Sequence, residues 1–562
     1  MKNRASSHMV VLLVIIALTA LAHYSIYYGG LIRGFETSWL TAGRNLFLFV
    51  PFLLAPVFLM RYTKFAGNWT LYTSALLLFS IGLVGQYRLF TDPEYISSKD
   101  KAEARQEKIE TLQLHYIQEN YSAEKKRMMG LPPTDPAPVD LSQEKPRPST
   151  DTFFAIATST RTWLPLFAFL CCIGAYIACR REDTLSFLQK YGFEVVLLTL
   201  IPLLIAAVMS RAGKFLGGMT PWEPAKIPFL IGFAAIVTLL YKDRTYWGIP
   251  NPRSILTLVT MAVIPFIPFF VLKDFGQMLV FSAVYVTLYL IAVKKFTQRL
   301  VLVGSMLIVI GILVISALPD NVLSQVRFLP ELASPVKDIL PDRIQQRFHL
   351  WLDGFNPPGP ETKWWKEDYD DYYKRLAEKL AEKNLDLSEM IAEDPKMKDN
   401  INVDAWFDVL AFQPAQATFG LSSGGTTGRG LGLGYPELIP VADSDYIYSA
   451  LGEELGLAGG LLLIFALIIF VSAGVRTAME SRDMFSKLCC AGLTAFIGFQ
   501  ALVNIGGITR ALPMTGITLP FVSHGGFSLI TSFTMLGMLL AFSHRNGAEA
   551  KLLEQEHKAD SA

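Results

Sequence analysis

Most of this chain consists of long apolar runs with few charged residues, separated by short polar stretches. A helix needs about 20 consecutive apolar residues to cross the hydrocarbon core of a bilayer, and the runs are close to that length. We therefore predict an all-α polytopic membrane protein with about twelve transmembrane helices. The predicted spans are residues 8–27, 43–60, 70–90, 161–179, 193–210, 226–241, 254–272, 277–293, 300–318, 447–474, 486–507 and 524–543.

Two long polar segments interrupt this series of spans. Residues 91–150 are charged and then proline-rich, a pattern that predicts a helix followed by an extended linker. Residues 319–446 form a larger loop before the last three spans, and its part 358–402 carries charged helix formers with a thin leucine stripe. Such a charge run predicts a solvated helical insertion.

The predicted organisation follows from these boundaries. In chain order it is 1–90 (three spans), 91–150 (insertion), 151–318 (six spans), 319–446 (large loop), 447–545 (last three spans, with a re-entrant stretch at 508–526) and 546–562 (tail).

Lysine and arginine concentrate in alternate short loops. Residues 242–253 and 294–299, for example, are richer in basic side chains than the loop at 211–214. Cytoplasmic loops carry this excess in membrane proteins, so the alternation predicts that both termini are cytoplasmic. The segments 91–150 and 319–446 then lie on the outer side of the membrane.

Composition narrows the classes further. The chain is 52% hydrophobic and 18% charged with a net charge of +1, which excludes a disordered protein and offers no electrostatic argument for a nucleic-acid partner. Its 5 cysteines lie in or beside apolar runs without a pattern typical of disulfides or zinc, so buried free thiols are expected. The glycine-rich stretch SSGGTTGRGLGLG at 422–434 follows no predicted strand and lies outside, so we expect no bound nucleotide.

Polar side chains gather at the outer ends of several spans. A charge near bilayer depth costs about 2.5–3.5 kcal/mol, so each one suggests a function, although any single pair can be an interfacial salt bridge or a helix cap. Four clusters on one face favour a shared polar cavity, which also tolerates irregular backbone such as GITLPFVSHGG at 516–526. The four clusters are Glu223 with Lys226; Lys273 with Asp274; Asp445 with Glu453 and Glu454; and Asn504 with Arg510, Pro520, Ser523 and His524.

Four ordered motifs resemble the SEDS family (shape, elongation, division and sporulation), whose members include FtsW and RodA. They are TPWEPAK at 220–226, KDFGQ at 273–277, the stretch from QPAQ at 413–416 through EELG at 453–456, and NIGGITRALPMTGITLPFVSHGG at 504–526. His524 stands where a tyrosine is usual in the family, and Arg510 adds a positive charge. The resemblance spans roughly residues 200–545 and is weaker before that.

The resemblance implies a peptidoglycan glycosyltransferase that polymerises lipid II at the outer face of the bacterial cytoplasmic membrane, in cell division or elongation. It also implies a class B penicillin-binding protein as partner and a divalent cation, Mg²⁺ or Mn²⁺, bound with the substrate pyrophosphate. The reaction needs a base for the attacking hydroxyl and positive charge for the departing pyrophosphate. Lys226, Lys273 and Arg510 are candidates for that charge, and the apolar spans offer a place for the polyprenyl tails.

The family's catalytic aspartate lies in the large external loop, and three residues here are candidates. In NVDAWFDVLAFQPAQ, Asp408 stands two residues after Trp406, as in the family motif, and is our first choice. Asp353, in RFHLWLDG, is the second choice and Asp404 the third. The alternative is that Asp408 only caps or pairs locally and that the catalytic position has been lost.

Candidate substrate-binding residues are the residues of the four polar clusters except Glu454, together with Gln416. Two other classes of function remain open. A lipid II flippase would need charged groups accessible from both sides of the membrane, whereas the clusters here face outward. A catalytically silent scaffold for a penicillin-binding protein would need no aspartate at the base position.

Overall fold

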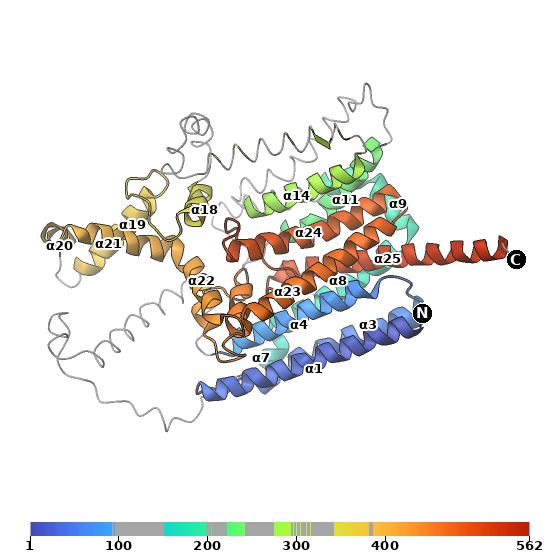
Figure 1. The fold of residues 1–562 in the computed structure, drawn as a ribbon, viewed down its shortest axis with the longest axis horizontal. Coiled ribbons are helices and arrows are strands. Elements are labelled where there is room, and N and C mark those ends of the chain that lie inside the picture. Colours follow the sequence, from blue (N-terminus) through green and yellow to red (C-terminus); the bar gives the residue numbers. More distant parts are fainter. Residues whose placement is uncertain are drawn as a thin grey trace.

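The computed structural model describes residues 2–92, 95, 151–197, 222–241, 275–293, 342–381 and 386–560, with isolated positions between 200 and 315. Every regular element in these residues is a helix (Figure 1). The predicted spans 254–272 and 300–318, most of 193–210, and the insertion 91–150 fall largely outside them.

Six stretches are long and apolar enough to cross a membrane. They belong to α1 (Lys2–Ile32), α4 (Trp69–Thr91), α7 and α8 (Phe153–Thr158 and Thr160–Cys179), α23 (Ile447–Glu480), α24 (Met484–Ile508) and α25 (Gly526–Asp560). Figure 1 shows them side by side with nearly common direction, together with α11 (Trp222–Tyr241) and α14 (Phe275–Ala292). The chain is thus an all-helical polytopic membrane protein, as predicted, and the count of about twelve spans stays a prediction.

The run at 43–60 forms two helices rather than one continuous span. α2 (Trp39–Phe47) ends at Leu48, and α3 (Phe49–Tyr62) begins directly after it. Pro51 lies in the first turn of α3, where the missing N–H of proline costs no hydrogen bond. Inside a longer helix the same proline would remove one hydrogen bond, so the break before it is physically expected.

The core of the bundle lies where α24 packs against α11, α14 and α23, and where α25 runs along α8. The approach of α25 to α8 is close, because a Cβ built on Gly537 would lie 2.1 Å from the carbonyl oxygen of Cys172. Small residues allow such backbone contact between membrane helices. α25 then continues without interruption to Asp560, through the residues predicted as a separate tail, and projects beyond the bundle (Figure 1).

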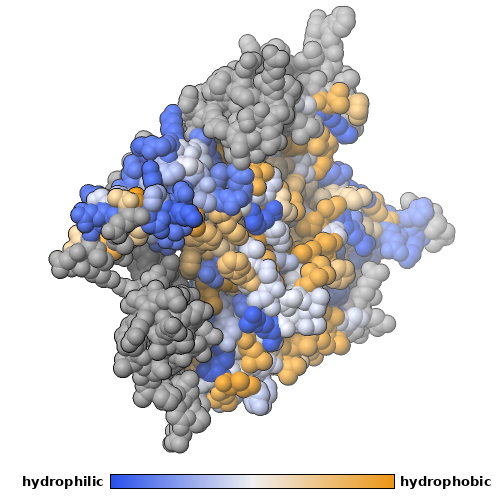
Figure 2. Space-filling view, turned by 60° about the vertical axis from the view of Figure 1, so that its left-hand side comes forward, coloured by the Kyte–Doolittle hydropathy of each residue, from blue (hydrophilic) through white to orange (hydrophobic). Residues whose placement is uncertain are grey.

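A second, smaller helical unit stands at one end of the bundle. It contains α18 (Asp342–Leu352), α19 (Lys366–Ala381), α20 (Leu387–Glu393), α21 (Lys396–Trp406), a π-helical turn (Phe407–Ala411) and α22 (Phe412–Gly424). We call it the external unit. Its own hydrophobic core is built around Trp365 and Trp406, both fully buried. Figure 2 shows hydrophilic residues gathered on this unit, whereas hydrophobic residues cover much of the side of the bundle.

Candidate active site

Glu223 and Lys226 form a buried ion pair inside the bundle. Lys226 Nζ lies 2.7 Å from Glu223 Oε1 and donates a second hydrogen bond, 2.8 Å long, to Gln500 Oε1 on α24. Gln277 on α14 donates to the same Glu223 oxygen at 3.0 Å. Lys226 is fully buried, so its charge depends on these partners. The pair predicted on one helix face is therefore present, and it ties α11, α14 and α24 together.

The segment 516–526 enters the bundle as irregular backbone, and side chains of neighbouring helices satisfy its carbonyl groups. Gln86 donates to Val522 O at 3.2 Å, Gln500 to Thr518 O at 3.0 Å, and Asn504 to Ile517 O at 2.6 Å. Unsatisfied carbonyls at membrane depth would cost several kcal/mol each, which explains why amide side chains occur in these apolar helices. After buried Pro520, Phe521 has φ 64° and packs its buried ring on Phe470 and Phe533.

Ser523 and His524 are engaged by the protein itself. The Ser523 hydroxyl donates to Ser444 O and accepts from Leu519 N at 2.8 Å, so it serves the loop. The His524 backbone N–H donates to Asp443 O at 2.8 Å. Burial lowers the pKa of the His524 side chain to about 4, with nearby arginines adding to the effect, so this imidazole is neutral at pH 7.

The glycine-rich stretch forms a tight cap that packs on α23 beside the break in this helix at Gly456 (φ 66°). Glu453 Oε1 accepts from Tyr435 N at 2.9 Å, and Glu454 Oε2 accepts from Gly432 N at 3.1 Å. Gly428 has φ 83°, and a Cβ there would lie 2.1 Å from Glu454 O, so only glycine permits this contact. Glu453, a predicted substrate-binding residue, thus holds the cap in place.

A buried ion network beside the cap was missed by the sequence analysis. Arg88, near the end of α4, contacts Asp92 at 2.6 Å, Glu437 at 3.0 Å and also Glu454. Arg33, after α1, joins the network through Asp92 at 3.0 Å and through Glu437. Arg88 near the end of a predicted span was the available signal. Its partners on the cap and α23 lie more than 340 residues away, which no local pattern reveals.

The candidate bases all lie in the external unit. Asp408 is exposed on the π-helical turn, and Asp404 is exposed one turn earlier on α21. Burial and the neighbouring Asp408 carboxylate raise the pKa of Asp404. Asp353 lies just after α18, with its Oδ2 3.5 Å from His349 Nδ1. The rings of Phe355 and Phe407, which adjoin the two principal candidates in sequence, are 5.8 Å apart.

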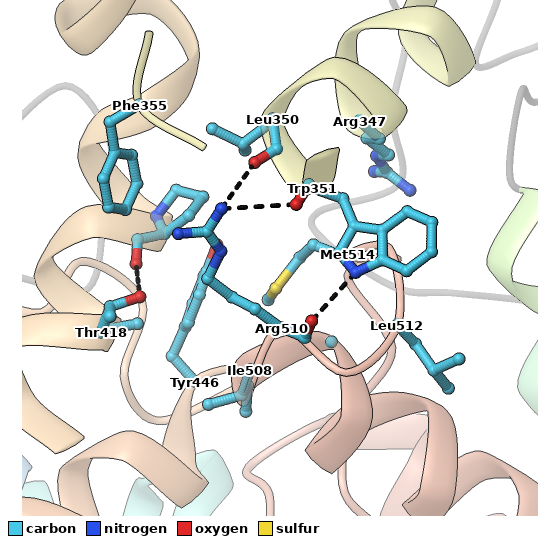
Figure 3. Close-up of a pocket in the computed structure, with 13 residues that line it drawn as sticks. Arg347, Leu350, Trp351, Phe355, Thr418, Tyr446, Ile508, Arg510, Leu512 and Met514 are labelled. Atoms are coloured by element: carbon cyan, nitrogen blue, oxygen red, sulfur yellow. Dashed lines mark hydrogen bonds between the residues drawn. The ribbon is translucent and has the colours of Figure 1, made fainter. Parts of the chain in front are cut away.

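The external unit meets the bundle around Arg510 (Figure 3). Arg510 Nη2 donates to Leu350 O at 3.2 Å and Trp351 O at 3.4 Å at the end of α18, while Trp351 Nε1 donates back to Arg510 O at 2.9 Å. A cation at a helix C-terminus is stabilising, so Arg510 acts here as a cap of α18. The cavity between these residues, about 20 Å³, has room for one water molecule and not for a sugar.

Asp445 and Arg347 lie at the same junction. Arg347 Nη1 donates to Thr515 O at 2.9 Å, and its charge opposes the effect of burial on the neighbouring Asp445. Burial raises the pKa of Asp445 to about 6. Asn504 donates to the backbone carbonyl of Asp445 at 2.8 Å, and its own Oδ1 is buried without a hydrogen-bond partner among the described residues.

The remaining predicted residues are less informative. Gln416 is half-buried on α22, and Lys273 and Asp274 lie outside the described residues. Within the part of the chain that the structure describes, no three histidine, cysteine or acidic residues group as a metal cage.

An apolar groove of about 1030 Å³ runs along α14, α23 and α24. Its walls include Ile468, Val475, Gly498 and Leu502, and it extends from Lys487 at one end of α24 to Thr509 at the other. A concave apolar surface of this length in a membrane bundle can hold a long hydrocarbon chain.

Fold and site together define a polytopic helical membrane protein in which polar side chains of the bundle hold the irregular segment 516–526, next to an external unit with exposed carboxylates. The model of the FtsW/RodA/SpoVE family, described as cell cycle protein, matches residues 402–547. This range contains Asp408, the glycine-rich cap and the re-entrant segment. Over these residues the chain resembles the SEDS family.

Individual relatives are similar to this chain over part of their length. The peptidoglycan glycosyltransferase RodA of Mycobacterium bovis is 39% identical over 150 residues, which are 26% of this chain and 32% of that protein. RodA of Mycobacterium leprae is 29% identical over 371 residues, 64% of each chain. The matched region thus covers about a third of the first relative's length. Among solved structures, Thermus thermophilus RodA aligns with a TM-score of 0.42 at 13% identity, covering 85% of this chain and 97% of that one.

Proposed function

We propose that this protein is a peptidoglycan glycosyltransferase that polymerises lipid II into glycan strands at the outer face of the bacterial cytoplasmic membrane. The observation that carries the proposal is the placement of Asp408. It lies inside the family match, exposed on a π-helical turn of the external unit. π-Helical turns occur frequently at functional sites.

The proposed reaction is a single displacement between two lipid-linked sugars. The attacking hydroxyl oxygen forms a bond to the anomeric carbon while the bond from that carbon to the pyrophosphate oxygen breaks. Asp408 accepts the hydroxyl proton, and the electron pair of the broken bond leaves with the polyprenyl pyrophosphate. Asp404, four residues earlier, adds a second exposed carboxylate beside this turn.

A divalent cation is compatible with these residues as an ion shared with the substrate. Mg²⁺ is commonly bound by one or two carboxylates together with substrate phosphates, and Asp404 and Asp408 can supply that pair. When bound, the ion would neutralise charge on the leaving pyrophosphate. Arg510 is a weaker candidate for that task than the sequence suggested, because its Nη2 already donates hydrogen bonds to carbonyl groups of α18.

The apolar groove along α14, α23 and α24 is the proposed site of the polyprenyl tail. Its lining is mostly aliphatic and its volume of about 1030 Å³ suits a long flexible hydrocarbon better than a whole partner helix. A matched pair of variants tests this occupant. Gly498→Trp fills the groove and should reduce polymerisation about tenfold or more, whereas Gly498→Ala should leave it unchanged. Equal activity of the two variants would show that the polyprenyl tail does not bind in this groove.

The proposal includes a class B penicillin-binding protein as partner and cytoplasmic termini. Cysteine labelling from either side of sealed vesicles tests the topology. The thiol introduced by Ser388→Cys, at an exposed position of the external unit, should react only from outside. Labelling of this thiol only from inside would mean that the predicted topology is inverted. Co-purification of the full chain with the transpeptidase tests the partner.

Purified full-length protein, with and without the transpeptidase, can be given fluorescent lipid II with Mg²⁺ or Mn²⁺ and assayed for glycan strands. Asp408→Ala should lose activity by about a hundredfold or more, while Asp399→Asn, an exposed carboxylate on α21, should not. If only Asp353→Ala loses activity, Asp353 is the base. If both alanine variants polymerise like the parent, the general-base assignment is wrong. If the parent forms no glycan strands under any condition but moves lipid II across vesicle bilayers, a flippase is favoured. If it shows neither activity, a scaffold is favoured.

A further inference from the structure

His349 lies where the parts of the external unit meet. It belongs to α18, before the insertion, and is 7% exposed. Its ring centroid is 5.4 Å from that of Trp364, inside the insertion, and 5.4 Å from that of Trp406, after it. Its Nε2 lies 3.1 Å from Asn356 O, and its Nδ1 lies 3.5 Å from Asp353 Oδ2. One imidazole therefore contacts both flanks of the insertion and a candidate base.

The insertion also closes on itself. Asn402 Nδ2 donates to Pro358 O at 2.8 Å, and Asn402 Oδ1 accepts from Trp365 Nε1 at 2.9 Å. These bonds bring together residues 44 positions apart, so the two ends of the insertion are neighbours. The segments that carry Asp353 and Asp408 are therefore neighbours in the structure, although the insertion separates them in the sequence.

Hydrogen-bonding capacity determines what His349 can do. A carbonyl oxygen only accepts, so Nε2 carries the hydrogen in the contact with Asn356. In a neutral ring Nδ1 then has a lone pair that faces Asp353. This contact becomes a hydrogen bond only when one more proton is bound, either on the ring or on the carboxyl group. Burial lowers the pKa of His349, whereas the Asn356 carbonyl and Asp353 oppose this effect.

We propose that His349 is a positioning residue. It holds Asp353 and the turn at 353–357 against Trp406, and it thereby sets the spacing of Asp353 and Asp408 across the insertion. The catalytic meaning of this role rests on the proposed function. Whichever of the two carboxylates is the base, its position relative to the substrate must be held to within a fraction of an ångström, which rigid packing of the supporting side chains provides.

Three substitutions separate the contacts of the ring. His349→Phe keeps an aromatic ring and removes both polar contacts. In His349→Gln the side-chain amide nitrogen reaches approximately the place of Nε2 and can donate to Asn356 O, and in His349→Asn it reaches that of Nδ1 and can donate to Asp353. Phe348→Leu, one residue earlier on α18, is the control, since Phe348 packs against Trp351 instead.

Hydrogen–deuterium exchange of the full-length protein in detergent reads the positioning directly. His349→Phe should speed exchange at 353–357 about tenfold, while α24 and the Phe348→Leu control keep the parent's rates. In the lipid II assay, His349→Phe should lower kcat about tenfold with KM within about twofold, and Gln or Asn should restore part of the loss.

Unchanged exchange in His349→Phe would overturn the proposal, and so would faster exchange at an unchanged kcat. A fall in kcat without faster exchange would also overturn it, because His349 would then act other than through the turn. If the parent makes no glycan strands, the proposed function fails, whereas the exchange experiment still decides whether His349 holds the turn.

Discussion

The bundle and the external unit treat their polar groups in opposite ways. In the bundle, Lys226 is fully buried between Glu223 and Gln500, and amide side chains satisfy the carbonyls of the re-entrant segment. In the external unit the interior is aromatic, around Trp365 and Trp406, and the carboxylates of Asp404 and Asp408 are exposed. Buried polar residues therefore hold the bundle together, whereas the candidate bases of the external unit are exposed on its surface.

The difference follows from the solvent around each region. At membrane depth a polar group without a protein partner costs several kcal/mol, so its hydrogen bonds are committed to the fold. Outside, water solvates a carboxylate and leaves it free to exchange partners with a substrate. At the span ends, polar side chains such as Lys226 and Asn504 have protein partners, whereas the candidate bases Asp404 and Asp408 are exposed to solvent.

The largest expected effect comes from breaking the buried pair in the bundle. Lys226→Met leaves the Glu223 carboxylate buried without its cation and should lower the free energy of unfolding by about 3–5 kcal/mol. Unfolding in detergent measures this loss. The double variant Glu223→Gln with Lys226→Met removes both charges and should recover much of it. A single variant as stable as the parent would show that the pair does not hold the bundle together.

The corresponding change in the external unit should stay local. Trp406→Ala opens the aromatic core there and should cost about 3 kcal/mol, near the lower end for such truncations. The reason is that Trp406 Nε1 is buried with no hydrogen-bond partner in the described part of the chain, so its removal also relieves a penalty. Proteolysis should cut the 353–411 region faster while the bundle unfolds as before. Simultaneous loss of both would mean that the two regions fold as one unit.

His524 tests the boundary between the regions through pH. Its pKa is about 4 in the folded protein and 6.5 as the ordinary value, so the unfolded chain binds the proton more readily. The folded state therefore loses stability as the pH falls from 6.5 towards 4, by about 2 kcal/mol at pH 5. His524→Phe should lack this loss. Equal pH dependence of the parent and the variant would refute the assignment of His524 as the titrating group.

Asp445 should show an effect with the opposite sign. Its pKa is raised to about 6, so the stabilising influence of the protonated form is complete below about 4 and is lost as the pH rises through about 6. Asp445→Asn should therefore be more stable than the parent by up to about 3 kcal/mol at pH 7, and no more stable below pH 4. Asp399→Asn, on the exposed surface of α21, is the control for loss of one negative charge. If Asp445→Asn raises the free energy of unfolding equally at both pH values, the raised pKa of Asp445 is contradicted.

Several features of this protein were predictable from local patterns. The apolar runs that became α1, α4, α23 and α24 were recognised because spanning a bilayer depends on the length and composition of one helix. The Glu223–Lys226 pair was expected because residues three apart on a helix are neighbours. The segment 516–526 was recognisable as irregular from its proline and glycines, and as a family motif.

The roles of individual polar residues depended on contacts that no local pattern contains. Arg510 is one charge in a loop by sequence, yet the structure makes it the cap of α18, about 160 residues earlier. Ser523 had two partners open to it, substrate or loop, and Ser444 O and Leu519 N occupy its hydroxyl. Arg88 finds Glu437 and Glu454 only because α1, α4 and α23 pack together.

The sequence by itself therefore determined the class of protein, its main spans and its resemblance to the SEDS family, because these depend on short stretches of chain in a given solvent. Only the tertiary structure decided which polar groups are committed to the scaffold and which remain exposed. That distinction depends on burial and on partners hundreds of residues apart. It places Asp408 at the surface and His349 at the junction of a motif that the sequence shows as interrupted.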